Sequence, residues 1–176
     1  MVGYPQVFTT EQVAGLVGLD SKKDSWRILK FAESREYGIQ PSISTPRGSG
    51  SRRLYDLENV CEFALALRLL ETGLRSAAIG KVLKQLKGQL GSKVGTAEKS
   101  LYLVIIRTPH PGKPLAEKRP QEVRFAEDIE AATKILKSRR DDDVLLIPVG
   151  SMLRGLKTNS EVVSNAVYSP KLSFRA

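Results

Sequence analysis

The stretch TTEQVAGLVGLDSKKDSWRILKFAES, residues 9–34, decides how the chain begins to fold. Its two threonines are candidate N-caps, and the glutamate after them falls in a first helical turn, where the helix dipole favours negative charge. Val13, Leu16 and Val17 share one helix face, and Gly18 is a typical C-terminal stop. A second amphipathic segment follows a tight turn. Two short helices joined in this way are the outline of a helix-turn-helix.

The second segment, SKKDSWRILKFAES, is predicted to bury its apolar residues and to leave its cations outside. Trp26 is expected in the core, because a large apolar ring on a short amphipathic helix usually anchors that helix. Leu29 is expected to point inward as well, with Ile28 as a further candidate for the inward face. The residues of this segment that remain available to a partner are Ser21, Lys22, Lys23, Ser25, Arg27 and Lys30.

A short hairpin is expected next, within YGIQPSISTPRGSGS, residues 37–51. Pro41 and Pro46 forbid a helix, and the isoleucine-containing stretches are short enough to pair as two strands. Gly48 and Gly50 suit a tight turn at the tip of the hairpin. A helix-turn-helix followed by an arginine-bearing hairpin is the layout of a winged helix-turn-helix domain.

Two further helices and a change in composition follow. DLENVCEFALALRLLETG, residues 56–73, has an Asp56 cap and apolar residues at helical spacing, and residues 74–90 repeat the pattern. Cys61 is expected as a buried thiol. Glycines with small polar neighbours then predict a linker at residues 88–98.

The remaining residues are predicted to form a small α/β unit. Residues 101–107 and 122–125 have the composition of strands, residues 127–140 that of a helix and residues 141–150 that of a buried strand, with SPKLSFRA as a tail. The predicted fold class is therefore α+β. Its parts are a winged helix-turn-helix domain at residues 1–87, a Gly-rich linker at residues 88–98, and a small α/β domain at residues 99–176 for dimerisation, effector sensing or partner contact.

Composition limits the class of protein. The chain has 28 Lys and Arg against 19 Asp and Glu, a formal net charge of +9, which favours a polyanionic partner because neutralised phosphates release counterions. A hydrophobic content of 41% is typical of a globular protein. No apolar run reaches the roughly 20 residues of a membrane span, and no signal peptide is recognisable. We therefore expect no membrane contact and a cytoplasmic location at the bacterial nucleoid.

The sequence offers no support for catalysis, a metal ion or a cofactor. Gly48 and Gly50 match neither glycine spacing of the phosphate-binding loops. His110 lies in a proline-flanked loop with no nearby acid to orient it, and the three aspartates of residues 141–143 are typical of a solvated turn. One cysteine and one histidine exclude thiolate or imidazole clusters within one chain. We expect a protein that is not an enzyme.

Four runs of the first half occur in the order and spacing of a known pattern. They are FTTEQVAGLVGL, FAESREYGIQP, GSRRLYDLENV and LRLLETGLRSAAIGKVL. Together, over roughly residues 7–87, they resemble the MerR family of transcriptional regulators. The resemblance implies a winged helix-turn-helix whose second helix enters the major groove and whose wing reaches the DNA backbone. It also implies a homodimer that binds double-stranded DNA in a sequence-specific way.

The sequence departs from the family pattern in two places. Several additional residues stand between Gly18 and Phe31, so either Arg27 or Lys30 occupies the family's arginine position on the recognition helix. The glycines of residues 88–98 also interrupt the family's long dimerisation helix, each costing about 1 kcal/mol relative to alanine. The mode of dimerisation is therefore left open.

The predicted wing supplies the second group of DNA contacts. Phosphates are bound by arginine, lysine and hydroxyl side chains. The family resemblance points to either Arg52 or Arg53, and to Tyr55, which either packs beneath the wing or donates a hydrogen bond to a phosphate. The wing candidates are Arg47, Ser49, Ser51, Arg52, Arg53 and Tyr55.

Two alternatives to a transcriptional regulator remain open. The same winged fold serves DNA-architectural factors of phages and plasmids, such as excisionase-like or partition proteins. Alternatively, the working part is the segment 99–176, as an enzyme or a small-molecule-binding domain that the N-terminal module only tethers. The sequence does not separate a DNA-architectural factor from a transcriptional regulator.

Overall fold

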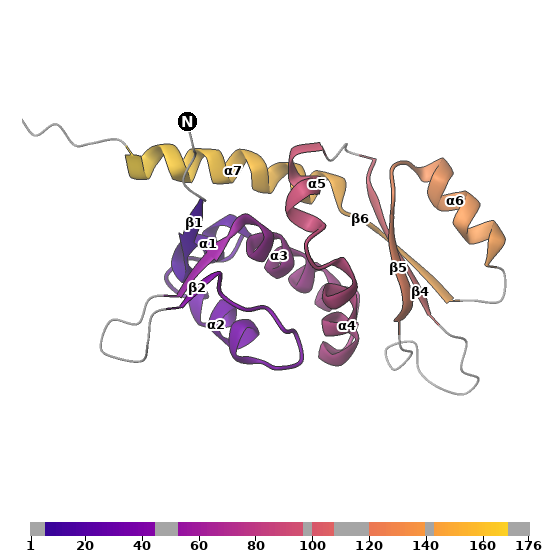
Figure 1. Cartoon of the computed structure of the whole chain (residues 1–176), viewed down its shortest axis with the longest axis horizontal. Coiled ribbons are helices and arrows are strands. Elements are labelled where there is room, and N and C mark those ends of the chain that lie inside the picture. Colours follow the sequence, from indigo (N-terminus) through magenta and orange to yellow (C-terminus); the bar gives the residue numbers. More distant parts are fainter. Residues whose placement is uncertain (1–5, 45–52, 97–99, 108–119, 140–142, 169–176) are drawn as a thin grey trace, which may run out of the picture.

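The computed structural model describes residues 6–44, 53–96, 100–107, 120–139 and 143–168. Over these residues the chain is mixed α+β, with seven helices and two antiparallel sheets of three strands each (Figure 1). The α+β class expected from the sequence is therefore confirmed.

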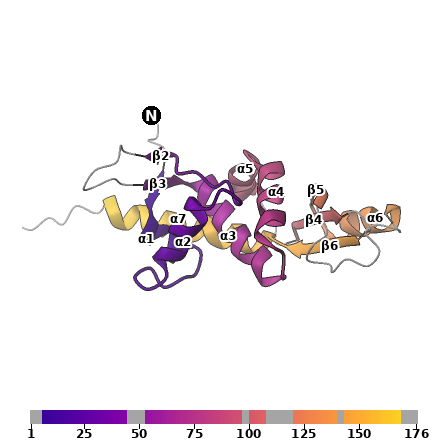
Figure 2. The same cartoon turned by 90° about the horizontal axis from the view of Figure 1, so that it is seen from below.

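One end of the molecule is built from a small sheet and four helices (Figure 2). The strands, in spatial order, are β1 (Val7–Thr9), β3 (Arg53–Asp56) and β2 (Ile43–Ser44). The helices are α1 (Thr10–Leu16), α2 (Ser25–Glu33), α3 (Leu57–Glu71) and α4 (Ser76–Leu86). β3 pairs antiparallel with both neighbours, so β2 and β3 form a hairpin whose connection, residues 45–52, lies outside the described residues.

Local capping explains where α1 begins and ends. The Gln12 amide donates a hydrogen bond to the Thr9 hydroxyl (3.3 Å), and the Thr9 amide donates one to the Gln12 side chain (2.8 Å). This reciprocal capping box satisfies two amides that a helix start leaves unpaired. The chain leaves the helix at Gly18, whose φ of +82° is a conformation that glycine adopts without a steric penalty. The predicted first helix is confirmed.

Helix α2 begins at Ser25 and not at Ser21. The Asp20 carboxylate accepts hydrogen bonds from the amides of Lys22 and Lys23, each 3.0 Å long. Such local side-chain bonds hold the backbone in a turn and compete with the helix. The prediction that Ser21, Lys22 and Lys23 lie on the second helix is therefore wrong, because these residues form the turn in front of it.

The buried face of α2 also differs from the expected one. Ile28 and Phe31, three residues apart, are the buried side chains of this nine-residue helix. The Trp26 side chain is 49% exposed, so the prediction that it lies in the core is wrong. Trp26 and Ile28 are two positions apart, so their side chains point in different directions from the helix. Ile28 points toward the core, and Trp26 therefore does not.

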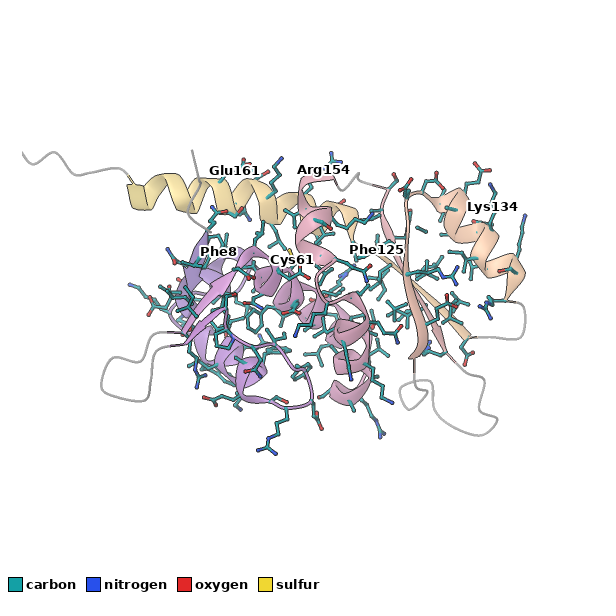
Figure 3. The ribbon with its side chains drawn as sticks, viewed as in Figure 1. Phe8, Cys61, Phe125, Lys134, Arg154 and Glu161 are labelled. Atoms are coloured by element: carbon teal, nitrogen blue, oxygen red, sulfur yellow. The ribbon has the colours of Figure 1, made fainter. Side chains whose placement is uncertain are left out.

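Helix α3 is the centre of the core. Asp56 caps it by accepting a hydrogen bond from the Asn59 amide (2.9 Å), as the sequence predicted. The Phe63 ring packs edge-on against the Tyr55 ring, with centroids 5.2 Å apart. Cys61 is buried in this helix, as expected, and burial raises the pKa of its thiol (Figure 3). The predicted pair of helices α3 and α4 is confirmed.

Most of the predicted linker, residues 88–98, is helical. Helix α5 (Leu90–Thr96) lies within it and buries both of its large apolar side chains. The Glu58 carboxylate of α3 accepts hydrogen bonds from the Gly88 amide (2.9 Å) and the Leu90 amide (3.2 Å). For residues 88–96 a flexible linker is therefore a wrong prediction, because the Glu58 carboxylate of α3 caps a segment whose glycines alone disfavour a helix. The last two residues of the predicted linker lie outside the described residues.

The second sheet occupies the other end of the molecule (Figures 1 and 2). Its strands, in spatial order, are β5 (Pro120–Ala126), β4 (Tyr102–Arg107) and β6 (Asp143–Pro148). Helix α6 (Ile129–Ser138) connects β5 to β6 and is capped by Asp128, which accepts a hydrogen bond from the Ala131 amide (2.7 Å). These four elements have the types predicted for residues 101–150.

The alternation of side chains along β4 separates two apolar clusters. Leu103 and Ile105 pack into the main core with the helices of the first half. Val104 and Ile106 face the other way and pack with α6. Both faces of this central strand are therefore covered, which explains its uninterrupted apolar sequence.

Helices α4 and α5 cover the β5 side of the sheet. The Val123 amide of β5 donates a hydrogen bond to the Gln85 side chain of α4 (3.0 Å). Phe125 points from β5 toward the helices, and the Lys93 ammonium of α5 lies 5.7 Å from its ring centroid (Figure 3). This contact joins the two ends of the molecule.

Helix α7 (Gly150–Tyr168) has no counterpart in the predicted elements. It leaves β6 and runs back along the first half, where it packs against α1, α3 and α5 (Figure 1). Leu153 and Leu156 of α7 belong to the same buried cluster as Val60 and Leu103. The segments predicted as domains 1–87 and 99–176 thus share one core, since α7 and the inner face of the sheet complete it. The predicted tail, residues 169–176, lies outside the described residues.

Candidate nucleic-acid interface

Helices α1 and α2 pack against each other across the turn that contains Asp20. This region contains six of the side chains predicted to contact DNA. Those in the turn are all exposed, and those on α2 are exposed or half-buried. The exposed candidates are Ser21, Lys22, Lys23 and Lys30, and the half-buried ones are Ser25 and Arg27.

Lys30 lies against the exposed ring of Trp26. Its ammonium nitrogen is 4.6 Å from the ring centroid, within the range of a cation–π contact. The contact holds the ammonium at the outer face of α2. The sequence contains a signal for this cation–π contact, because an aromatic residue and a cation four positions apart lie on the same face of a helix. The contact was not predicted, because Trp26 was expected in the core.

Arg53 of β3 forms an ion pair with Glu33 at the end of α2, with 3.1 Å between Nη2 and Oε1. The two side chains are 37% and 61% exposed, so water screens the pair. The pair ties the return strand of the hairpin to α2, a contact that the sequence did not predict. The other cationic and hydroxyl candidates of the wing lie outside the described residues; they are Arg47, Ser49, Ser51 and Arg52.

Tyr55 does not reach the surface. Its side chain is fully buried, with the ring against Phe63. Burial raises the pKa of its hydroxyl, and the nearby Arg53 and Thr10 side chains lower it in part. Of the two roles that the sequence left open, packing beneath the hairpin is the one observed. A phosphate contact from Tyr55 is a wrong prediction, because β3 is the central strand of its sheet and turns this ring into the core.

Helix α4 carries a row of cations that was not among the predicted contacts. Lys81 and Lys84 of α4, and Lys87 directly after its end, follow one another at intervals of three residues and are exposed, while the apolar side chains of α4 face the core. Their spacing was a readable signal, since residues three apart lie on neighbouring parts of a helix surface. α4 is joined to the segment after α2 by the Tyr37 hydroxyl, which donates a hydrogen bond to the Ser76 hydroxyl (3.0 Å).

The described part of the chain contains no group of three or more His, Cys, Asp or Glu side chains placed to hold a metal ion. None of its helices combines the length and the apolar composition of a membrane span. His110 and two of the three consecutive aspartates lie outside the described residues.

No protein-family model matches the chain, and no curated protein matches it either.

Proposed function

We propose that this protein is a sequence-specific regulator that binds double-stranded DNA through a MerR-like winged helix-turn-helix. In this proposal α1 and α2 are the helix-turn-helix, and β2 and β3 are the strands of the wing. The observation that carries it is the ion pair between Arg53 and Glu33, which ties the wing strand to a helix whose outer face presents Arg27 and Lys30.

The two parts have different roles in recognition. A recognition helix reads base edges with the residues near its N-terminus, where Ser25 and Arg27 of α2 stand. Lys22 and Lys23, in the turn before α2, are suited to phosphates, because an exposed lysine presents a compact positive charge on a flexible stem. Specificity then comes from α2, and most of the salt-dependent affinity comes from the turn, from Lys30 and from the wing.

Regulation by such a protein requires occupancy of a promoter, and the family resemblance adds distortion of the DNA. Operators read by helix-turn-helix proteins have twofold symmetry, which suits a homodimer with two recognition helices. The elements after α5 would then serve dimerisation, effector sensing or partner contact. This function places the protein in the cytoplasm, at the nucleoid.

The test measures DNA affinity against salt concentration for a duplex selected from a random pool and for a random duplex. The wild-type chain is compared with Lys30→Ala and with the control Lys134→Ala, a lysine of α6 at the far end of the molecule (Figure 3). Lys30→Ala should weaken binding to both duplexes and reduce the slope of log affinity against log salt by about one unit, whereas the control should change neither.

Two outcomes contradict the proposal. Affinity that does not depend on salt would exclude phosphate binding. Equal affinity for selected and random duplexes would exclude a sequence-specific regulator, and would favour a non-specific architectural protein.

A further inference from the structure

A cavity of about 460 Å³ opens beside α2. Its lining is Trp26, Arg27, Lys30, Phe31, Ser34, Tyr37 and Leu70. We propose that it binds a small aromatic carboxylate, and that occupancy weakens DNA binding because the carboxylate engages Arg27 and Lys30. The second half of this inference rests on the proposed function, whereas the first half does not.

The apolar wall of the cavity is built from side chains that are fixed by other contacts. The Phe31 ring packs against Tyr37 at 4.5 Å and against Phe63 at 6.3 Å between centroids. The hydroxyl of Tyr37 is held by Ser76. Rings that are already ordered lose little entropy when a ligand stacks on them, so this wall is pre-organised for a flat apolar group.

Trp26 supplies the open face of the cavity. An indole ring that is 49% exposed on a globular surface is an apolar area still available for burial. A planar ligand stacked on it is held by the offset-stacked geometry that aromatic pairs prefer. A volume of about 460 Å³ lies within the range of small-molecule sites, which limits the occupant to one or two fused rings.

The charge of the cavity points to an anion. Arg27 and Lys30 are the charged groups of the lining, and no carboxylate belongs to it. Three acids stand next to lining residues in sequence. Glu33 and Glu71 form ion pairs with Arg53 and Arg68 outside the cavity, and Glu36 is not among the lining residues. The two cations therefore face the cavity without an acid among its lining residues, and a carboxylate at the edge of an aromatic ligand complements them.

Binding of such a ligand would compete with DNA for the same cations. In the proposed function Arg27 reads base edges and Lys30 contributes salt-dependent affinity, and a bound carboxylate neutralises part of the charge of both side chains. By linkage, DNA must weaken ligand binding by the same factor as the ligand weakens DNA binding. A ligand in this cavity would thus regulate DNA binding directly at α2, the proposed recognition helix.

The probe is 1-naphthoate, with the neutral 1-naphthamide as its matched control. Trp26 is the single tryptophan of the chain, so its indole N–H gives one resonance in a ¹H–¹⁵N spectrum and reports on this cavity alone. Naphthoate should shift that resonance in a saturable way. Naphthamide should bind about fivefold more weakly, the upper end of the contribution of one exposed charge pair.

Charge in the cavity is tested by Lys30→Gln, with Lys134→Gln as the control on α6. Lys30→Gln should weaken naphthoate binding by about fivefold and leave naphthamide unchanged, whereas Lys134→Gln should alter neither. Lys30 is exposed, so the substitution leaves the core intact. The binding site is overturned if naphthoate produces no saturable shift, or if naphthoate and naphthamide bind equally well.

The regulatory half is tested on the selected DNA duplex with and without saturating naphthoate. DNA affinity should fall by at least about tenfold, the middle of the range of measured couplings between sites. If naphthoate binds and DNA affinity is unchanged, the regulatory half is wrong and the site stands. If the chain does not bind DNA even without naphthoate, both the proposed function and the regulatory half of this inference are wrong. The naphthoate titration then still shows whether the cavity binds an aromatic carboxylate.

Discussion

Arg53 on the central strand of the first sheet and Glu33 at the end of α2 form an ion pair 3.1 Å long. Both side chains are more than one-third exposed, so the pair stabilises the fold by at most about 1 kcal/mol. Its consequence is positional: the strand that returns from the hairpin is held against the helix proposed to read DNA. The Arg53 guanidinium is therefore already paired with the Glu33 carboxylate in the protein without DNA.

The first prediction follows from this pairing. Glu33→Gln removes a negative charge next to the proposed DNA surface and releases Arg53 for a phosphate. DNA affinity should increase, and the slope of log affinity against log salt should steepen by about one unit. Salt titrations of the variant and the wild type measure both quantities.

Glu161→Gln is the control for charge alone, because Glu161 is exposed on α7, far from α2 (Figure 3). It should leave the slope unchanged. If Glu33→Gln and Glu161→Gln behave alike, Arg53 is not a DNA contact that Glu33 restrains.

A second prediction concerns the close approach between α4 and the segment after α2. A Cβ atom at Gly80 would overlap the carbonyl oxygen of Glu36, which belongs to the backbone and cannot swing away. Gly80→Ala should therefore destabilise the protein, by about 2 kcal/mol or more, although alanine favours a helix by about 1 kcal/mol over glycine. Urea unfolding monitored by circular dichroism measures the change.

The matched control is Gly155→Ala in α7, where a Cβ atom meets nothing within 4 Å. Here only the helix preference acts, and the protein should gain about 0.5–1 kcal/mol. If both substitutions change the free energy of unfolding in the same direction, Glu36 does not pack on Gly80 as the structure has it.

A third prediction concerns the cap of α5. Glu58 accepts hydrogen bonds from the amides of Gly88, Leu90 and Gly91, so Glu58→Ala leaves the start of α5 without acceptors from α3. The loss should be about 1–3 kcal/mol in the free energy of unfolding. Amide exchange should accelerate over residues 88–96 before it does in α3. Unaltered exchange in that segment would mean that its helix does not depend on the cap.

The fourth prediction is a pH dependence. Burial, with a smaller contribution from the nearby Glu58, raises the pKa of Glu62 above its usual value, even though Asn59 donates a hydrogen bond to its carboxylate (3.1 Å). A carboxyl with a raised pKa binds more protons in the folded state than in the unfolded state. Its contribution is therefore favourable at low pH and is lost as pH rises from about 4, the unfolded pKa, through the raised folded value.

Glu62→Gln keeps the acceptor for Asn59 and removes the titration. The stability of the variant relative to the wild type should grow from about pH 4 upward, as followed by urea midpoints at a series of pH values. A difference between the two proteins that is constant across this range would contradict a raised pKa at Glu62.

Helix caps and the apolar pattern of β4 made much of the fold predictable. The Thr9 and Gln12 capping box and the Asp56 cap are contacts between residues three apart, so the sequence contains both partners side by side. The uninterrupted apolar run of β4 is an equally local signal. The α+β class and the types of most elements follow from such signals.

The candidate site was predictable as a set of residues but not as an arrangement. Lys22, Lys23 and Lys30 were identified from charge and spacing, and they are exposed as expected. The burial of Tyr55 and the exposure of Trp26 depend on how the elements pack against one another. The composition of the local sequence does not determine that packing. The cavity beside α2 needs Leu70, which stands far along the chain from Trp26.

By itself, the sequence determined helices α1, α3, α4 and α6, the strands of the second sheet and the basic character of the chain, because these depend on neighbours within one or two turns. Only the tertiary structure decided that the glycine-rich segment is helical and that α7 returns to close the core. Glu58 reaches α5 across 32 residues of chain, and Arg53 reaches Glu33 across 20. Contacts over such separations depend on how the elements pack, and no local pattern contains them.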